Sequence, residues 1–179
     1  MLSVSSMHPV ELMTSSMTTV INIPLGEWED YKGECRMSKI TQFRGNYYFL
    51  SNFSDYPVRL DGLIYLNGEA AFQAGKVTTH NERLAFVGIP PNIAKSKGRK
   101  VKLRSDWEAI KVDRMRQVID AKFSDPKLAK LLDQTGDAEL LEGNSWHDKI
   151  WGVDSITLQG QNQLGKILMA KREQLRGNL

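Results

Sequence analysis

The longest stretch of regular hydrophobic spacing in this chain runs from Trp107 to Phe123. Its apolar residues recur every three or four positions, which predicts one amphipathic helix. The run Ser105-Asp106-Trp107-Glu108 matches a capping box, in which a serine hydroxyl and a glutamate carboxylate satisfy free backbone amides at the start of a helix. Because a helix of this length must bury its apolar face, we expect it to cross the core of a folded domain.

Shorter elements flank this helix on both sides. MSKITQF (37–43) and NYYFLSNF (46–53) carry the aromatic and β-branched residues of strands, and a small sheet is predicted to begin there. Asp61-Gly62 lies between two more strand-like runs and predicts the tight turn of a hairpin. Asn67 is suited to cap the alanine-rich helix that follows it. Further helices are predicted at 92–98, 126–132, 137–142 and 162–176.

Residues 1–36 differ from the rest of the chain. Met, Ser and Thr dominate the start of this segment, and neither a helical nor a strand period is sustained long enough to define an element. We therefore expect a loosely ordered N-terminal arm over 1–36 and a folded domain over 37–179. The arm fits either a poorly ordered tail or a partner-binding segment that uses Trp28 and Tyr31.

Composition excludes several classes of protein. With 179 residues, 41% hydrophobic and 25% charged, the chain suits one globular domain and is unlike a collagen, a coiled coil or a disordered chain. The single Cys35 excludes an intramolecular disulfide and a multi-cysteine zinc site, and the three histidines are scattered, so no metal or cofactor is expected. No apolar run approaches the roughly 20 residues of a membrane span, and the first residues lack the pattern of a secretory signal, so we expect a cytoplasmic protein.

The predicted helix after Asn67 carries the most informative spacing. Glu69, Phe72, Gln73 and Lys76 stand at i, i+3, i+4 and i+7, so they share one face. Alanines on the opposite side allow close packing against a neighbour. The shared face fits either the wall of a pocket or a solvated amphipathic surface anchored by the phenylalanine, and spacing alone leaves both interpretations open.

Three other clusters also have two interpretations each. The loop from Trp146 to Gly152 holds two tryptophans, which fit either a stacking surface for a planar ligand or a plug of the core. Asn52 and Phe53 follow a predicted strand, where side chains often converge on a cleft, although turn chemistry also explains such residues. The basic run over 95–104 fits either phosphate binding or a solvated face, and a net charge of +3 permits a phosphate-bearing partner without requiring one.

Five segments, in this order, resemble the signature blocks of the NADAR family, also called the YbiA-like N-glycosidases: YYFLSNF, GEAAFQAGK, GRKVKLRSDWEAIKVDRM, DKIWG and GQNQLGKILMAKREQL. The resemblance runs from about Phe43 to Leu175. It implies a compact α+β fold, mainly helical, with a small antiparallel sheet, in agreement with the predicted elements. It also implies cleavage of an N-glycosidic bond between ribose and a base or amino group.

The resemblance implies two classes of substrate, which are small ribosyl phosphates such as early riboflavin-pathway intermediates, and ADP-ribosylated guanine in nucleic acid. The alternative is a non-catalytic module that binds ADP-ribose or NAD. The matching residues give Glu69, Lys76 and Asp148 as candidate catalytic residues. Candidate substrate-binding residues are Arg44, Asn52, Phe53, Phe72, Gln73, Arg99, Trp107, Lys111, Trp151, Gly152 and Asn162.

Breaking a ribosyl C–N bond builds positive charge on the sugar, so a nearby carboxylate and a proton donor would both help. Glu69 and Asp148 are the candidates for these roles. Lys76 would either attack C1 of an opened ribose as a Schiff-base nucleophile, or bind phosphate, or pair with Glu69. Ala70 and Gln163 stand where many relatives carry His and Arg, so we expect no histidine to act as the general acid.

Overall fold

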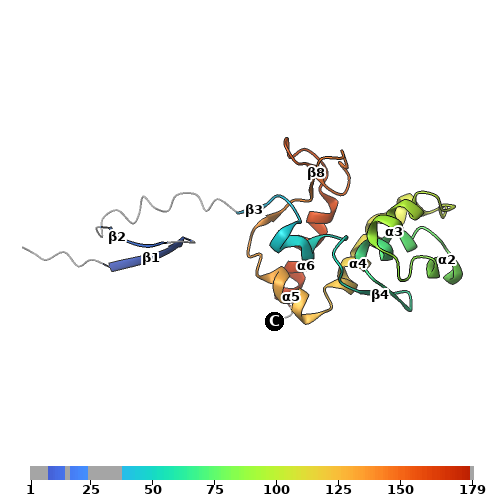
Figure 1. The fold of residues 1–179 in the computed structure, drawn as a ribbon, viewed down its shortest axis with the longest axis horizontal. Helices are drawn as coiled ribbons and strands as arrows, with labels where there is room; N and C mark the ends of the chain where they lie inside the picture. Colours follow the sequence, from blue (N-terminus) through green and yellow to red (C-terminus); the bar gives the residue numbers. More distant parts are fainter. Residues whose placement is uncertain (1–7, 15–16, 24–37, 178–179) are drawn as a thin grey trace, which may run out of the picture. The chain divides into compact units, whose positions relative to one another are not determined.

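A computed structural model describes residues 8–14, 17–23 and 38–177. The chain divides into two compact units, 1–36 and 37–179. In the first, β1 (His8–Thr14) pairs with β2 (Met17–Ile23) in an antiparallel hairpin, with His8 opposite Ile23 (Figure 1). The expectation of no regular element here is therefore wrong for these residues, because β2 is rich in β-branched residues that favour strands. Trp28, Tyr31 and Cys35 lie outside the described residues.

The second unit consists mainly of helices, with three pairs of very short strands. Its elements are β3 (Lys39–Ile40), the 3-10 helix η1 (Gly45–Leu50), β4 (Val58–Leu60), β5 (Leu63–Tyr65), α1 (Gly68–Ala74), α2 (His80–Leu84), α3 (Pro91–Gly98), α4 (Trp107–Lys122), α5 (Pro126–Asp133), β6 (Glu139–Leu140), β7 (Gly143–Asn144), β8 (Val153–Asp154) and α6 (Gln163–Gly177). β4 pairs with β5 antiparallel, whereas β3 with β6 and β7 with β8 are parallel pairs.

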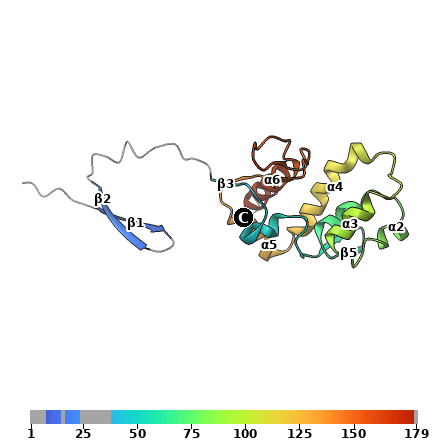
Figure 2. The same ribbon diagram turned by 45° about the horizontal axis from the view of Figure 1, so that its top comes forward.

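The long helix α4 lies centrally in this unit, as the sequence predicts. It packs against α1, β4 and α6, and it lies between α6 and the region of α2 and α3 in both views (Figures 1 and 2). The predicted capping box is wrong, because α4 begins at Trp107 after Asp106, whose side chain makes no cap hydrogen bond. The Asp106 carboxylate instead accepts from the Arg104 guanidinium at 2.6 Å. Among the described helices, none has the length and apolar character needed to cross a membrane.

Two other local predictions are wrong. Residues 46–53 do not form a strand, because Gly45 has a φ of +54° and the chain turns into η1. Residues 137–142 do not form a helix, because β6 pairs there with β3, about a hundred positions earlier in the chain. The hairpin turn at Asp61-Gly62 and the helices α1, α3, α5 and α6 are confirmed.

All seven residues of α1 are buried, so its polar groups need partners inside the protein. At its start, Asn67 Oδ1 accepts from the Ala70 amide at 2.8 Å, and Asn67 Nδ2 donates to the Ile89 carbonyl at 3.1 Å. Near its end, the buried Arg114 donates to the Ala71 carbonyl at 2.9 Å and pairs with Asp61 at 2.8 Å. These contacts fix α1 between the hairpin turn and α4.

Lys122, at the end of α4, supports the segment that follows η1. Its side chain is only 1% exposed, and its Nζ donates to the Ser51 carbonyl at 2.7 Å and to Ser54 Oγ at 2.8 Å. Burial lowers the pKa of Lys122 to about 7. The two hydrogen bonds hold the turn that carries Asn52 and Phe53.

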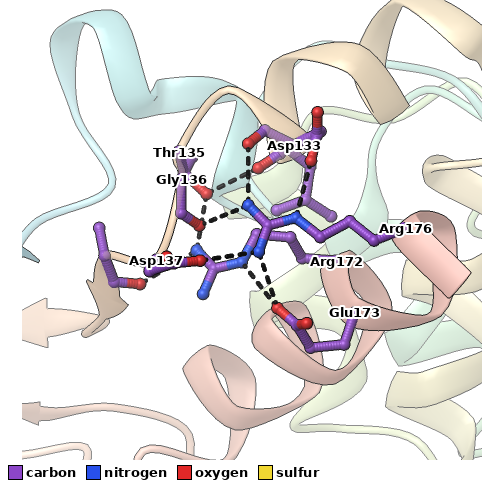
Figure 3. A network of polar contacts seen from close by, with 9 residues as sticks. Asp133, Thr135, Gly136, Asp137, Arg172, Glu173 and Arg176 are labelled. Carbon is purple, nitrogen blue, oxygen red and sulfur yellow. Dashed lines mark hydrogen bonds and ion pairs between the residues drawn. The ribbon is translucent and has the colours of Figure 1, made fainter.

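The last helix is joined to the turn between α5 and β6 by an arginine network (Figure 3). Arg172 donates to Thr135 Oγ1 at 2.8 Å and to the Ala138 carbonyl at 3.0 Å. Arg176 donates to Asp133 at 2.8 Å and to Asp137 at 2.9 Å. The network therefore holds the chain just before β6 against α6.

Asn67→Ala is expected to lower the free energy of unfolding by about 2 kcal/mol, because it removes the cap of α1 and leaves the buried Ala70 amide without its acceptor. Urea unfolding followed by circular dichroism measures this loss. The matched control is Asn92→Ala on the exposed side of α3, which should change stability by no more than about 0.5 kcal/mol. Equal effects of the two substitutions would contradict the structural role of Asn67.

Candidate active site

A cavity of about 560 Å³ lies in the second unit, between α1, α3, α4, the region of η1 and the loop after β7. This volume is typical of small-molecule sites. Of the residues predicted from the sequence, those that line it are Arg44, Asn52, Phe53, Glu69, Phe72, Gln73, Lys76, Arg99, Trp107, Lys111, Asp148 and Trp151. The clusters that the sequence left separate therefore meet around one space.

The shared face of α1 forms a buried wall of this cavity. Glu69 is 8% exposed and Gln73 5%, and Gln73 Nε2 donates to Glu69 Oε1 at 2.8 Å. α3 approaches so closely that a Cβ at Gly98 would overlap the Gln73 side chain. Burial decides between the two interpretations of this face, because a solvated surface would leave the carboxylate and the amide exposed.

The cavity favours the neutral forms of Glu69 and Lys76. Burial raises the pKa of Glu69, and Asp148 raises it further, against the opposing effects of Gln73, Lys95 and Lys76. Burial likewise lowers the pKa of Lys76, while Glu69 acts in the opposite direction. The two pKa shifts have the same main cause, which is the loss of water around both groups in the cavity.

Lys76 is held at one end by α3 and faces an aromatic wall. Its Nζ donates to the Gly98 carbonyl at 3.1 Å and lies 5.8 Å from the centroid of the Trp107 ring. Phe72 packs against Trp107 and Trp151, with ring centroids 5.2 Å and 5.1 Å apart. Of the two loop tryptophans, Trp151 is thus part of the wall, whereas Trp146 is 53% exposed.

Basic side chains from different elements lie around the cavity. Arg44, Lys95, Arg99 and Lys111 all line it, and Lys95 Nζ lies 5.3 Å from the Phe53 ring and 5.7 Å from the Trp146 ring. Two other members of the basic run make contacts away from the cavity, since Lys97 donates to the Ala85 carbonyl and Arg104 pairs with Asp106. Two members of the run, Lys95 and Arg99, thus line the cavity, and phosphate binding by them stays a prediction.

Asp148 lines the cavity and also shapes the loop that carries it. Its Oδ1 accepts from the amides of Ile150 at 3.1 Å and Trp151 at 2.9 Å, and its own amide donates to Asn144 Oδ1 at 2.9 Å. Asn144 Nδ2 returns a bond to the Asp148 carbonyl at 2.8 Å. Asp148 thus positions Trp151 in addition to presenting a carboxylate.

Gly152 and Asn162 do not line the cavity, which corrects their expected place in it. A Cβ at Gly152 would overlap the backbone carbonyl of Glu142. Asn162 Oδ1 accepts from the Glu142 amide at 3.2 Å, and its Nδ2 donates to the Leu140 carbonyl at 2.8 Å. Both residues support the segment around Glu142 from behind.

Glu142 itself lines the cavity and was missed from the sequence. Burial and the neighbouring Asp148 raise its pKa to about 7, with Lys95 opposing. It was missed because the pattern of 137–142 predicts a short helix. A glutamate at the end of such a helix gives no indication of a functional site. Ala70 does not line the cavity, and in the described part of the chain no group of His, Cys, Asp and Glu is placed to hold a metal ion.

The NADAR domain model matches residues 40–176, which is most of the chain and contains every residue that lines the cavity. The chain belongs to the NADAR family. The sequence-based assignment of the family and the α+β fold class are thereby confirmed.

Several relatives of this NADAR protein carry functional names. The N-glycosidase YbiA of Escherichia coli K12 is 36% identical over 129 residues, or 70% of this chain and 79% of that protein. An N-glycosidase of Nostoc punctiforme is 33% identical over 136 residues, or 72% and 86%. A riboflavin biosynthesis protein of Vibrio vulnificus is 34% identical over 134 residues, which cover 73% of this chain and 36% of that protein.

The fold is similar to a solved structure as well. The NMR structure of Escherichia coli YbiA superimposes with a TM-score of 0.67 at 33% identity, covering 80% of this chain and 91% of that one. The relatives' names support the expectation of an enzyme, specifically a hydrolase that acts on N-glycosyl bonds.

Glu69→Gln is expected to raise the free energy of unfolding at about pH 7 and to have little effect at about pH 4. The folded protein favours protonated Glu69 more than the unfolded chain does, so stability is lost as pH rises through and above the unfolded pKa. Glutamine removes that ionisation. Urea unfolding at the two pH values measures the difference.

The matched control for this prediction is Glu139→Gln, which removes a surface carboxylate paired with Lys39 at 2.8 Å. It should bring no gain at neutral pH, because surface ion pairs contribute little. A Glu69→Gln protein that is less stable than the wild type at neutral pH would show that the carboxylate is ionised and well compensated in the cavity.

Proposed function

We propose that this protein hydrolyses the C1′–N bond between ribose 5-phosphate and an amino group of a planar heterocycle, as in phosphorylated riboflavin-pathway intermediates. The observation that carries the proposal is that the buried Glu69 and the half-buried Lys76 line one cavity with aromatic walls and a basic rim. The riboflavin pathway is supported by the name of the Vibrio vulnificus relative.

The two ends of such a substrate have different surroundings in the cavity. Arg99 and Arg44 supply positive charge for the phosphate, and Lys111 lines the same cavity while paired with Glu108. The rings of Phe72, Trp107 and Trp151 form an apolar wall for the heterocycle or the face of the ribose. Glu69 and Lys76 also line this cavity, and the proposal puts the ribose beside them.

In the proposed hydrolysis, the bond between C1′ and nitrogen breaks as positive charge develops on the ribose. Glu69, whose pKa is raised by burial, gives its proton to the leaving nitrogen. Asp148 presents a carboxylate that stabilises the positive sugar. Water supplies the hydroxyl group that adds to C1′ and the proton that restores Glu69.

In a second form of the mechanism, Lys76 makes a covalent bond to the ribosyl group. The lowered pKa favours a free amine, which would attack C1′ of the opened ribose. The bond from C1′ to the nitrogen of the heterocycle then breaks, that nitrogen leaves with the proton of Glu69, and water hydrolyses the Schiff base to release the ribosyl group. In the alternative roles, Lys76 binds the phosphate or pairs with Glu69 without forming a bond to the substrate.

ADP-ribosylated guanine is a second candidate substrate because it contains the same type of bond. The exposed Trp146 and the neighbouring Lys95 favour it, since a stacking ring beside a cation suits a base of an oligonucleotide. A module that binds ADP-ribose or NAD without cleaving it is the remaining alternative.

Glu69→Gln is expected to reduce turnover by at least about 100-fold, because it removes the proton donor while preserving shape. Mass spectrometry of products is the measurement, with the phosphorylated riboflavin intermediates, an ADP-ribosylated guanine oligonucleotide and NAD incubated in parallel.

Release of ribose 5-phosphate from the intermediates supports the proposal, and release of ADP-ribose from the oligonucleotide alone favours the second candidate. Retention of a ligand without cleavage would replace both with the binding module. Glu139→Gln is the control for charge and should retain wild-type turnover.

Borohydride is expected to trap a covalent adduct between the wild type and the ribosyl group during turnover, and Lys76→Ala should yield none. Reduction of the Schiff base adds a stable mass that peptide mapping assigns to Lys76. Lys100→Ala is the control, because this exposed lysine does not line the cavity. Unimpaired turnover in Lys76→Ala would exclude the nucleophilic role.

A further inference from the structure

Glu142 is a second glutamate in the cavity, and its backbone is fixed from two sides. Its amide donates to Asn162 Oδ1 at 3.2 Å, and its carbonyl accepts from the Val153 amide at 3.0 Å. The absence of a side chain at Gly152 permits this close approach. Such support from behind is what a functional side chain needs for a defined position.

The carboxylate of Glu142 has no structural explanation among the described residues. Its Oε2 is shielded from solvent and has no hydrogen-bond partner there, and no ion pair of those residues includes it. Buried polar atoms in folded proteins are almost always paired, so an unpaired one at a cavity points to a ligand or a reacting group. In contrast, Glu69 has its partner in Gln73.

Charged groups from several elements act on Glu142. Asp148, from the loop after β7, disfavours its ionised form, whereas Lys95 of α3, Lys122 of α4 and Arg44 before η1 favour it. Together with burial, they leave its pKa at about 7. A carboxyl group poised in this way exchanges a proton readily near neutral pH, which is the property of an efficient general base.

We propose that Glu142 is a catalytic residue of this site, the general base that activates the attacking water. This inference rests on the proposed function. The oxygen of water bonds to C1′ while its proton passes to the Glu142 carboxylate. The electron pair of the C1′–N bond goes to the nitrogen, which takes the proton of Glu69. The proton on Glu142 then passes through water to Glu69, which restores both groups. In the covalent form, Glu142 activates the water that hydrolyses the Schiff base in the same way.

The test separates base from acid by the leaving group. It compares Glu142→Gln, Glu69→Gln and the wild type on the cleaved natural substrate and on 4-nitrophenyl ribofuranoside 5-phosphate, whose leaving group needs no proton. Both variants should lose at least about 100-fold on the natural substrate. On the nitrophenyl substrate, Glu69→Gln should recover and Glu142→Gln should not.

Two further measurements keep the test independent of folding. In the wild type, kcat/KM should rise with pH through a midpoint near 7, and Glu142→Gln should lack this rise. Formate, a small exogenous base, should restore turnover to Glu142→Ala, which only a folded protein can show. Glu139→Gln is the control of equal charge on the preceding strand.

The outcomes that overturn the inference differ from those that overturn the function. Turnover of Glu142→Gln equal to that of Glu139→Gln would remove Glu142 from the chemistry. Recovery of Glu142→Gln on the nitrophenyl substrate would make Glu142 an acid rather than a base. A wild type that cleaves none of the substrates would overturn the proposed function, and this role of Glu142 with it.

Discussion

The complete burial of α1 is the constraint on which the rest of the structure depends. A helix enclosed on every side must find partners for its ends and for its polar side chains within the protein. Asn67 and Arg114 do this for the backbone, and Gln73 does it for one oxygen of Glu69. What remains of the polar face opens on the cavity. The cavity is therefore the side of α1 that the fold leaves for a ligand.

Local chemistry in the sequence predicted much of this arrangement. The hairpin at Asp61-Gly62 depends on two residues that accept a positive φ, and both have one in the structure. The face of α1 depends only on the period of a helix, which places Glu69, Phe72 and Gln73 together, and Lys76 follows in the turn after the helix ends. Such features are encoded within a few consecutive residues, so they can be recognised without knowledge of the fold.

The features that were missed depend on contacts between distant segments. β6 exists because β3 pairs with it, and nothing in 137–142 encodes that partner. Glu142 was missed for the same reason, since its place in the cavity follows from Asn162 and Gly152 rather than from its own neighbours. The family resemblance did identify Gly152 and Asn162. Spacing cannot tell, however, whether a residue faces a cavity or supports it from behind.

The arginine network of α6 makes the end of the chain part of the site. Arg172 and Arg176 hold the turn before β6, and Asn162, just before α6, holds Glu142. The last helix and one wall of the cavity therefore form a single cooperative unit, in which local opening of one releases the other. Local unfolding of α6 that breaks these contacts therefore also loosens the segment that carries Glu142. The stability of α6 thus sets how long this wall of the cavity stays in place.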